Sequence, residues 1–456
     1  MAHQQGAGRR LNGSTIVARA TPAGRGGVGI VRISGPGVRA IAEAVLGGCP
    51  TPRVATLHAF RDADGQTLDT GLALFFPKPQ SYTGEDVLEL QAHGGPVLLD
   101  MLVARVVALG ACVARPGEFS ERAFLNDKLD LLQAEAVADL IDAGSRVAAR
   151  AAQRSLSGEF SAAILGLNEQ VNGLRMYVEA AIDFPEEEID FLNTDELRRR
   201  LHAVADEFNR IEAAARQGRL LRDGIHVVIA GRPNSGKSSL LNRLAGYEAA
   251  IVTDQPGTTR DLVREHLEID GLPVHMVDTA GLRATNDVVE REGVERTRGQ
   301  LVVADLALLV VDVTDAAPLD PLLAEVPAGV PRIVVRNKID LTEEAPGVDT
   351  AAEPMVVRLS ALTGAGFNEL RQLIKSRAGF DEPGEGTVIA RQRHLDSIRR
   401  ARQHFDAGRA QLEVNRAGEL LAEELRAAQV ALAEITGEFT SDDLLGEIFG
   451  KFCIGK

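Results

Sequence analysis

Cysteine is scarce in this sequence. Only Cys49, Cys112 and Cys453 occur among 456 residues, they lie far apart, and no two of them form a CxxC pair. This spacing argues against a disulfide scaffold and against a cysteine-based zinc site, because both use regularly spaced cysteines. We therefore expect a protein of a reducing compartment, and the cytoplasm fits.

Long apolar segments are also missing. No run approaches the roughly 18 apolar residues that indicate a membrane span. The Arg9-Arg10 pair could belong to a secretion signal, but no apolar stretch of the needed length follows it. We expect residues 1–14, which are polar and rich in glycine, to form a disordered leader.

Positive charge is in deficit as well. The chain has 50 Lys and Arg residues against 65 Asp and Glu, a formal net charge of −15 at pH 7. Phosphate neutralisation dominates nucleic-acid affinity, so a protein that binds nucleic acid strongly by itself more often carries a basic surplus. If RNA is involved, we expect a local basic patch or a more basic partner protein.

The apolar pattern divides the chain into domains, as its length leads one to expect. Short strand-like runs around one apolar helix predict an α+β domain over residues 15–127. Residues 128–223 and 381–456 carry apolar residues at helical spacing, which predicts an all-α domain in two parts. Between them, residues 224–380 alternate buried strands with helices, as parallel α/β sheets do. The predicted fold is multidomain, with an α/β domain inserted into a helical domain.

A phosphate-binding loop opens the inserted domain. The run Gly231-Arg-Pro-Asn-Ser-Gly236-Lys237-Ser238 matches GxxxxGK[ST] and lies between a predicted strand and a predicted helix. Glycines let main-chain amides face the phosphates at the helix N-terminus. Lys237 supplies a charge to the outer phosphates, and the Ser238 hydroxyl can ligate Mg²⁺.

Two later motifs predict that the nucleotide base is guanine. Asn337-Lys338-Ile339-Asp340 follows a buried strand and matches NKxD, in which the Asp carboxylate can accept both the ring N–H and the exocyclic amine of guanine. The segment Ser360-Ala361-Leu362 ends another strand and fits the loop that supports the base from the other side.

Two switch motifs complete the nucleotide site. In Asp278-Thr279-Ala280-Gly281 the aspartate can hold Mg²⁺ through water, and the glycine amide can contact the γ-phosphate. In the run Gly257-Thr258-Thr259-Arg260-Asp261 a threonine should complete the Mg²⁺ shell, and we expect it to be Thr259. The predicted nucleotide-binding set is Asn234, Ser235, Gly236, Lys237, Ser238, Ser239, Thr253, Asp254, Gln255, Pro256, Gly257, Thr258, Thr259, Asp278, Thr279, Ala280, Gly281, Asn337, Lys338, Asp340, Ser360, Ala361 and Leu362.

The water-positioning glutamine of Ras-like switches is absent, because Leu282 occupies its position. Hydrolysis must therefore recruit another group. Asp287 and Glu290 could reach back, or they could be solvated helix-end acids. Asn234 could help to bind a monovalent cation beside the phosphates, or it could only tolerate a tight loop.

Several further stretches resemble the MnmE (TrmE) family of tRNA-modification GTPases. They are Thr21-Pro-Ala-Gly-Arg-Gly-Gly-Val-Gly-Ile30, residues 115–128, residues 437–443, and the C-terminal Phe452-Cys453-Ile454-Gly455-Lys456. The resemblance extends over essentially the whole chain after the leader. It implies a Ras-like P-loop GTPase domain inserted into a helical domain and preceded by an α+β folate-binding-type N-terminal domain.

The resemblance also implies a one-carbon donor site. A 5-formyl- or 5,10-methylene-tetrahydrofolate would lie among Arg32, Glu89, Lys128 and Lys456. Without the resemblance, Arg32 and Glu89 would be interpreted as strand surface charges. Cys453 is either a small buried apolar residue or a participant in modification, as nucleophile or acid, and the sequence does not decide between these roles.

Potassium-dependent hydrolysis is a further implication. The K⁺ ligands would be Asn234, Thr253, Gln255 and Thr258, and K⁺ would promote face-to-face pairing of two GTPase domains. Glu290 would orient the attacking water, and Arg260 is a further catalytic candidate. The Gln255-Pro256 pair departs from the smaller or aliphatic residues of relatives. The change at residue 255 is harmless if that residue binds through its carbonyl, whereas the proline could stiffen the loop and alter its affinity for K⁺.

Taken with the resemblance, the sequence predicts a cytoplasmic homodimer, paired through its N-terminal domains, that acts with an FAD-containing MnmG (GidA)-type partner. Together they would install a 5-carboxymethylaminomethyl or aminomethyl group on the wobble uridine of certain tRNAs. One alternative is a ribosome-assembly or signalling switch, which should have an RNA-binding module after its GTPase domain. Another is a membrane-remodelling GTPase, which would need a lipid-binding element. Neither feature is evident in the sequence.

Overall fold

The computed structural model describes residues 13–183, 194–247, 264–278 and 304–455, apart from 316–317, 325, 328, 343, 382–383, 385 and 439–441. The chain divides into two compact units. The first comprises Met1–Ala138, Phe160–Thr194 and Arg400–Lys456, and the second comprises Asp139–Glu159 and Asp195–Arg399. Among the described residues, no helix is both long and apolar enough to cross a membrane.

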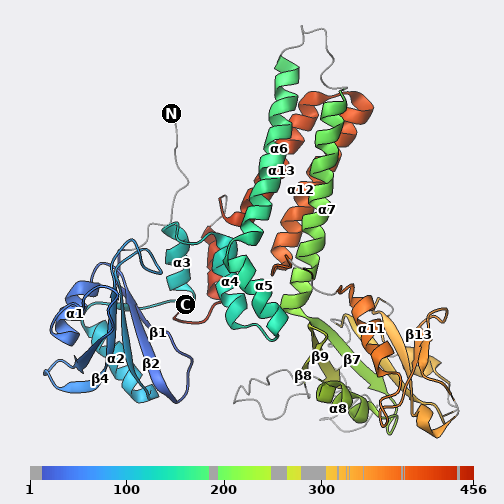
Figure 1. Cartoon of the computed structure of the whole chain (residues 1–456), viewed down its shortest axis with the longest axis horizontal. Coiled ribbons are helices and arrows are strands. Elements are labelled where there is room, and N and C mark those ends of the chain that lie inside the picture. The colour runs from blue at the N-terminus through green and yellow to red at the C-terminus, as the bar shows by residue number, and fades with distance from the viewer. Residues whose placement is uncertain are drawn as a thin grey trace. The chain divides into compact units, whose positions relative to one another are not determined.

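The first unit begins with a six-stranded sheet in the order β3-β4-β5-β2-β1-β6 (Figure 1). Neighbouring strands are antiparallel except for β1 and β6, which are parallel. Helices α1 (Val38–Leu46) and α2 (Pro96–Ala108) share one core with alternate strand residues, which makes the domain two-layered. The strands are β1 (Ile16–Arg19), β2 (Gly26–Ser34), β3 (Thr56–Arg61), β4 (Thr67–Phe76), β5 (Val87–Gly94) and β6 (Cys112–Val113).

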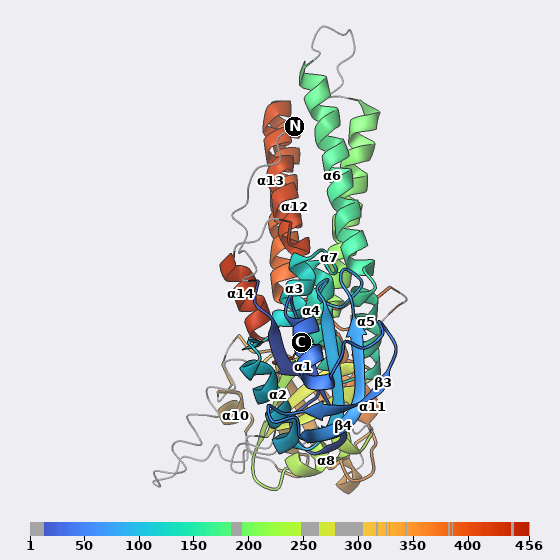
Figure 2. The same cartoon turned by 90° about the vertical axis from the view of Figure 1, so that its left-hand side faces the viewer.

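Helices make up the rest of the first unit. In α6 (Glu159–Asp183) the predicted apolar face is buried, from Phe160 to Val178. In α13 (Gly418–Thr436) the predicted face from Leu421 to Ile435 is buried too. Helix α13 packs against α12 (Gln392–Asn415), where a Cβ on Gly408 would lie 2.9 Å from the Glu424 Cβ, so the glycine permits a close approach (Figure 2). The remaining helices are α3 (Glu118–Leu125), α4 (Leu131–Ile141) and α14 (Asp442–Gly450).

The second unit contains a seven-stranded sheet in the order β12-β13-β11-β10-β7-β9-β8. Its five central strands are parallel, as predicted. Helices α8 (Lys237–Tyr247) and α11 (Phe367–Ala378) pack on one face, and α10 (Asp320–Ala324) packs on the other. The strands are β7 (Ile225–Gly231), β8 (Arg264–Ile269), β9 (Leu272–Asp278), β10 (Leu306–Asp312), β11 (Arg332–Asn337), β12 (Gly347–Asp349) and β13 (Met355–Arg358). The predicted combination of α/β, α+β and all-α parts is confirmed.

The two antiparallel edge strands, β8 and β12, were missing from the sequence prediction. Strand β8 reads Arg-Glu-His-Leu-Glu-Ile, which lacks the continuous apolar run of a central strand. Its turn to β9 is Asp270-Gly271, with φ of 50° and 91°. Asp-Gly with both residues at positive φ is a strong hairpin signal, and it is the signal that the prediction overlooked.

Two further helices of the second unit adjoin its sheet. Helix α7 (Asp195–Asp223) is followed by Gly224, whose φ of 64° turns the chain directly into β7. Helix α5 (Arg146–Leu156) contributes Ala151 and Ala152 to the core that α8 and α11 share with the sheet.

Candidate functional sites

The loop between β7 and α8 has the conformation that a phosphate cradle needs. Asn234 has a φ of 64° and Gly236 a φ of 94°, so the chain curls in the left-handed region. The Lys237 ammonium donates to the carbonyls of Gly231, at 2.8 Å, and Arg232, at 3.0 Å. These two hydrogen bonds hold the Lys237 ammonium against the first residues of the phosphate loop. Ser238 is exposed in the first turn of α8, where its hydroxyl is available to a cation.

Asn337 fastens this loop to the rest of the site. Its side chain is buried, donates from Nδ2 to the Ser235 carbonyl at 2.9 Å, and accepts at Oδ1 from the Ala361 amide at 2.9 Å. One amide therefore joins the phosphate loop to the segment beginning at Ser360. A side chain on Gly236 would occupy the same space, since its Cβ would lie 2.2 Å from Nδ2 of Asn337.

The other NKxD residues are also held in place. Lys338 has a φ of 71°, and its ammonium lies 2.6 Å from the Asp312 carboxylate at the end of β10. The hydrogen bond from Lys338 lowers the pKa of Asp312 to about 2. Asp340 is exposed and accepts from the Ser360 hydroxyl. Lys338 is therefore held by its ion pair with Asp312 at the end of β10, whereas the Asp340 carboxylate is exposed at the surface.

The segment from Ser360 to Leu362, predicted to support the base, is also held by Arg243, which the sequence prediction missed. The Arg243 guanidinium, from α8, donates to the carbonyls of Ala361, at 3.4 Å, and Leu362, at 3.1 Å. Asp312 was missed as well. The only sequence signal for it was an acid at the end of a buried strand, the same position that Asp278 holds at the end of β9.

Several predicted nucleotide-site residues lie outside the described part of the chain. Strand β9 is described to Asp278, so the backbone places this residue at the same edge of the sheet as the phosphate loop. The predictions that fall outside are Thr253, Asp254, Gln255, Pro256, Gly257, Thr258, Thr259, Arg260, Thr279, Ala280, Gly281, Leu282, Asp287 and Glu290.

In the N-terminal domain, Arg32 and Glu89 form a cross-strand pair. They are register partners on β2 and β5, and Nε of Arg32 donates to Oε1 of Glu89 at 2.9 Å. Both side chains are largely buried, with 23% and 16% of their surface exposed, so they are not ordinary surface charges. The guanidinium lies 5.4 Å from the centroid of the Tyr82 ring and 5.8 Å from that of Phe119. Charge and aromatic surface are thus combined at one place.

The loop that carries Tyr82 also contacts Lys128. A Cβ on Gly84 would lie 3.4 Å from the Cδ and Cγ atoms of Lys128. Asn126 donates from Nδ2 to the Thr83 carbonyl at 2.7 Å. The predicted residues Arg32 and Lys128 therefore border the same loop, although no direct contact between them is observed.

A buried arginine that the sequence prediction missed holds this loop. The Arg122 guanidinium donates to Glu85 at 3.0 Å, to Glu118 at 2.9 Å and to the Ser14 carbonyl at 2.9 Å. Its side chain is only 2% exposed. A charge can be buried at this depth because acids surround it. Burial also raises the pKa of Tyr82, so its phenol stays neutral and bonds to Ser120 at 2.8 Å.

The C-terminal segment packs against residues of the N-terminal half within the first unit. Ile454 pairs with Pro116 in an antiparallel bridge, and the Gly117 amide donates to the Cys453 carbonyl at 3.4 Å. Gly455 packs so tightly that a Cβ there would lie 1.9 Å from the Arg19 carbonyl oxygen. Cys453 is exposed, which contradicts the interpretation as a buried apolar residue. Lys456 lies outside the described residues.

Comparison with known proteins covers nearly the whole chain. A family model for the MnmE helical domain matches residues 131–453, and one for the N-terminus of the GTP-binding protein TrmE matches residues 15–128. A tRNA modification GTPase MnmE from Chromohalobacter salexigens is 58% identical over 448 residues, which cover 97% of this chain and 98% of that relative.

Solved structures of other GTPases match part of the chain. A variant of Aquifex aeolicus Era bound to GDP.AlF4⁻ is 27% identical and covers 40% of this chain and 67% of that one, with a TM-score of 0.27. The G domain of the T. maritima FeoB iron transporter is 28% identical and covers 34% of this chain and 98% of that one, with a TM-score of 0.26. At TM-scores this low, the structural likeness is too weak to support a conclusion.

Proposed function

Because this chain belongs to the MnmE family of tRNA modification GTPases, we propose that it hydrolyses GTP to drive modification of the wobble uridine in certain tRNAs. The observation that carries the GTP part is the Asn337 clamp. It joins the phosphate loop to the Ser360 segment, and Asp340 lies exposed beside that segment. A guanine ring between these elements would meet one carboxylate that accepts both of its N–H donors.

Exchange of Asp340 for asparagine tests this base assignment. Asp340→Asn replaces an acceptor-only group with one that also donates, so GDP affinity should fall and xanthine nucleotide affinity should rise. Calorimetric titration with GDP and with XDP measures both. Glu369→Gln, which removes an exposed acid from α11 of the same sheet domain, is the matched control. Unchanged GDP affinity in Asp340→Asn would refute the assignment.

The metal ions form the next part of the proposal. Mg²⁺ would be held by Ser238 and Thr259 and would neutralise charge on the outer phosphates. K⁺ would be held by Asn234 with Thr253, Gln255 and Thr258. Asn234 fits this role because it is exposed within the phosphate loop, where it adopts a left-handed conformation. Glu290 would orient water, with Arg260 as a further catalytic group.

Cation exchange tests the potassium part. Hydrolysis should be much faster in K⁺ than in Na⁺ at equal ionic strength, accompanied by pairing of the GTPase domains. Equal rates in the two cations would remove the K⁺ site from the proposal and leave GTP hydrolysis intact.

The one-carbon donor would bind beside Arg32 and Glu89, with Lys128 and Lys456. The partly buried Arg32–Glu89 pair and the aromatic rings beside it suit a polar, planar pterin. The lysines suit the acidic tail of 5-formyl- or 5,10-methylene-tetrahydrofolate. Cys453, which is exposed in the C-terminal segment, would take part in modification.

The assembly completes the proposal. The chain would act in the cytoplasm as a homodimer, together with an FAD-dependent MnmG (GidA)-type protein, to form the 5-carboxymethylaminomethyl or aminomethyl group. Mass spectrometry of wobble nucleosides in tRNA from cells lacking the chain tests this directly. Normal wobble nucleosides would favour the alternative of a switch without modification chemistry.

A further inference from the structure

Most arginines on the long helices are neutralised by acids one turn away. On α7, Arg199 pairs with Glu196, Arg210 with Glu207 and Arg216 with Glu212. The same pattern recurs on α12, in Arg409 with Glu413, and on α13, in Arg426 with Glu423. Such surfaces offer little net positive charge to a ligand.

Helix α5 differs from these helices. Arg146, Arg150 and Arg154 recur at every fourth position, and the helix contains no acidic residue. Within the described part of the chain, none of the three guanidinium groups makes a hydrogen bond or an ion pair. Arg146 and Arg150 are exposed and Arg154 is half-buried. We call these three residues the arginine stripe.

The opposite side of α5 is fixed. Ala148, Ala151, Ala152 and Ser155 are buried. The Ser155 hydroxyl accepts from the Ile389 amide at 3.0 Å, and the Ser145 hydroxyl caps the helix by accepting from the Ala148 amide at 3.0 Å. These contacts fix the orientation of the helix that carries the arginine stripe. Little backbone entropy is therefore lost when the arginine stripe binds a ligand.

We propose that the arginine stripe binds the phosphate backbone of the RNA substrate, an inference that rests on the proposed function. Successive stripe residues lie about 6 Å apart along the helix axis, so each can contact a different phosphate. Planar guanidinium groups bind phosphate oxygens in bidentate fashion. In a chain with a net charge of −15, a helix with three arginines and no acidic residue is a local source of positive charge that can attract a polyanion.

The exposed surface of α5 fits RNA better than it fits a protein. Its fully exposed residues are Arg146, Arg150 and Gln153, none of them aromatic or aliphatic, whereas Val147 and Leu156 are half-buried, as is Arg154. Protein interfaces centre on buried aromatic and aliphatic anchors, whereas phosphate contacts need only donors and charge.

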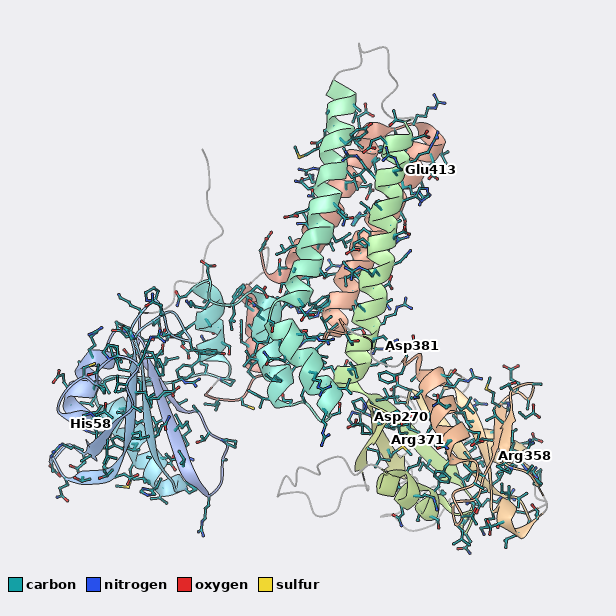
Figure 3. All side chains as sticks on the ribbon, in the orientation of Figure 1. His58, Asp270, Arg358, Arg371, Asp381 and Glu413 are labelled. Atoms are coloured by element: carbon teal, nitrogen blue, oxygen red, sulfur yellow. The ribbon has the colours of Figure 1, made fainter. Side chains whose placement is uncertain are left out.

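The stripe is also connected to the nucleotide site. Val147 of α5 packs at the β8–β9 turn, where a Cβ on Gly271 would lie 3.3 Å from the Cγ2 atom of Val147. In the same turn Asp270 is held by Arg371 and by Lys375, the latter at 3.0 Å; Figure 3 shows Asp270 and Arg371 together. Strand β9 then runs to Asp278 of the switch motif. The helix that carries the stripe therefore contacts the hairpin whose second strand ends at Asp278.

A charge-matched comparison of full-length variants tests the proposal. In the stripe variant Arg146, Arg150 and Arg154 are changed to Gln. In the control Arg199, Arg210 and Arg426 are changed to Gln, which removes the same charge from acid-paired positions. Binding of a fluorescein-labelled, unmodified tRNA transcript is followed by anisotropy over a series of KCl concentrations. GDP affinity and melting temperature show that each variant is folded.

The stripe variant should bind the transcript at least about tenfold more weakly at low salt. The slope of log K against log[salt] should shrink by about 2 to 3, since each lost phosphate contact contributes about 0.7 to 0.9. The control should match the wild type. Coupling between two binding sites is reciprocal. A GTP analogue should therefore change the RNA affinity of the wild type by the same factor by which RNA changes its affinity for the analogue.

Other outcomes overturn the inference in distinguishable ways. An unchanged salt slope in the stripe variant refutes the stripe while leaving the proposed function standing. Equal weakening in the control would mean that net charge, and not the stripe, governs binding. A wild type that hydrolyses GTP but binds no transcript refutes the stripe together with direct tRNA binding. Normal RNA binding with lost binding of the partner protein would reassign the stripe to an acidic protein surface.

Discussion

The nucleotide site and the Arg32 cluster differ in how their residues are gathered. Each part of the nucleotide site is a contiguous motif at the end of a parallel strand, and the sheet brings the ends together at one edge. The Arg32 cluster consists of Arg32, Glu89, Tyr82 and Phe119, which come from two strands, a loop and α3. The C-terminal segment packs against the same unit. The nucleotide site therefore forms whenever the sheet folds. The site around Arg32 forms only when several segments that are distant in the sequence pack together.

This difference predicts that damage to one site should leave the other intact. The two sites also lie in different compact units. Variants that weaken GDP binding should therefore keep folate binding, and the reverse should hold.

The largest effect is expected from Asn337→Ala. It leaves the Ser235 carbonyl and the Ala361 amide buried without a partner, at a cost of about 1 to 3 kcal/mol each. GDP affinity should fall by about 100-fold or more, measured by calorimetry, with tetrahydrofolate affinity unchanged. GDP affinity within threefold of wild type would show that the clamp is dispensable.

Gly455→Ala should have the next largest effect, at the other site. The φ of 98° and the close approach to the Arg19 carbonyl leave no space for a Cβ, so the C-terminal segment should detach. Tetrahydrofolate affinity should drop about tenfold, and modification of tRNA should be lost, while GDP affinity stays constant. Gly450→Ala is the control, because a Cβ there meets nothing within 4 Å. Equal folate binding in the two variants would separate the C-terminus from the site.

Glu89→Gln should have a smaller effect. It removes the charge that pairs with Arg32 but keeps an acceptor oxygen and nearly the same shape. Folate affinity should fall several-fold, and the melting temperature should change little, since a neutral hydrogen bond replaces a charge-assisted one. Glu43→Gln, an exposed acid of the same domain, is the control. Folate binding as tight as in wild type would mean that the Glu89 charge is not used.

The smallest effect is a pH dependence confined to the nucleotide site. Because Lys338 lowers the pKa of Asp312 from 3.8 to about 2, the pair stabilises the fold above pH 3.8 and loses this effect as the pH falls toward 2. In Asp312→Asn the melting temperature should be lower than wild type near neutral pH, and the two should converge in acid. A constant difference across a pH series would contradict this account.

The same contrast between contiguous motifs and residues from distant segments decides which parts of the two sites could be predicted from the sequence. The phosphate loop, NKxD and the Ser360 segment could be assigned because the chemistry of each lies within a few consecutive residues. Arg122 could not be found, because its acids Glu85 and Glu118 come from different segments and nothing in a lone arginine indicates burial. The edge strand β8 was missed because half-exposed strands carry a weak apolar signal.

The sequence by itself determined that the chain has a guanine nucleotide site in an inserted parallel α/β domain, since strand periodicity and local motifs are short-range properties. Only the tertiary structure decided that Asn337 clamps two loops, that Gly455 packs on Arg19, and that Ala151 and Ala152 of α5 are buried in the core shared with the sheet. These facts depend on contacts between residues far apart in the chain. Such contacts are set by the packing of whole elements, so no local pattern in the sequence encodes them.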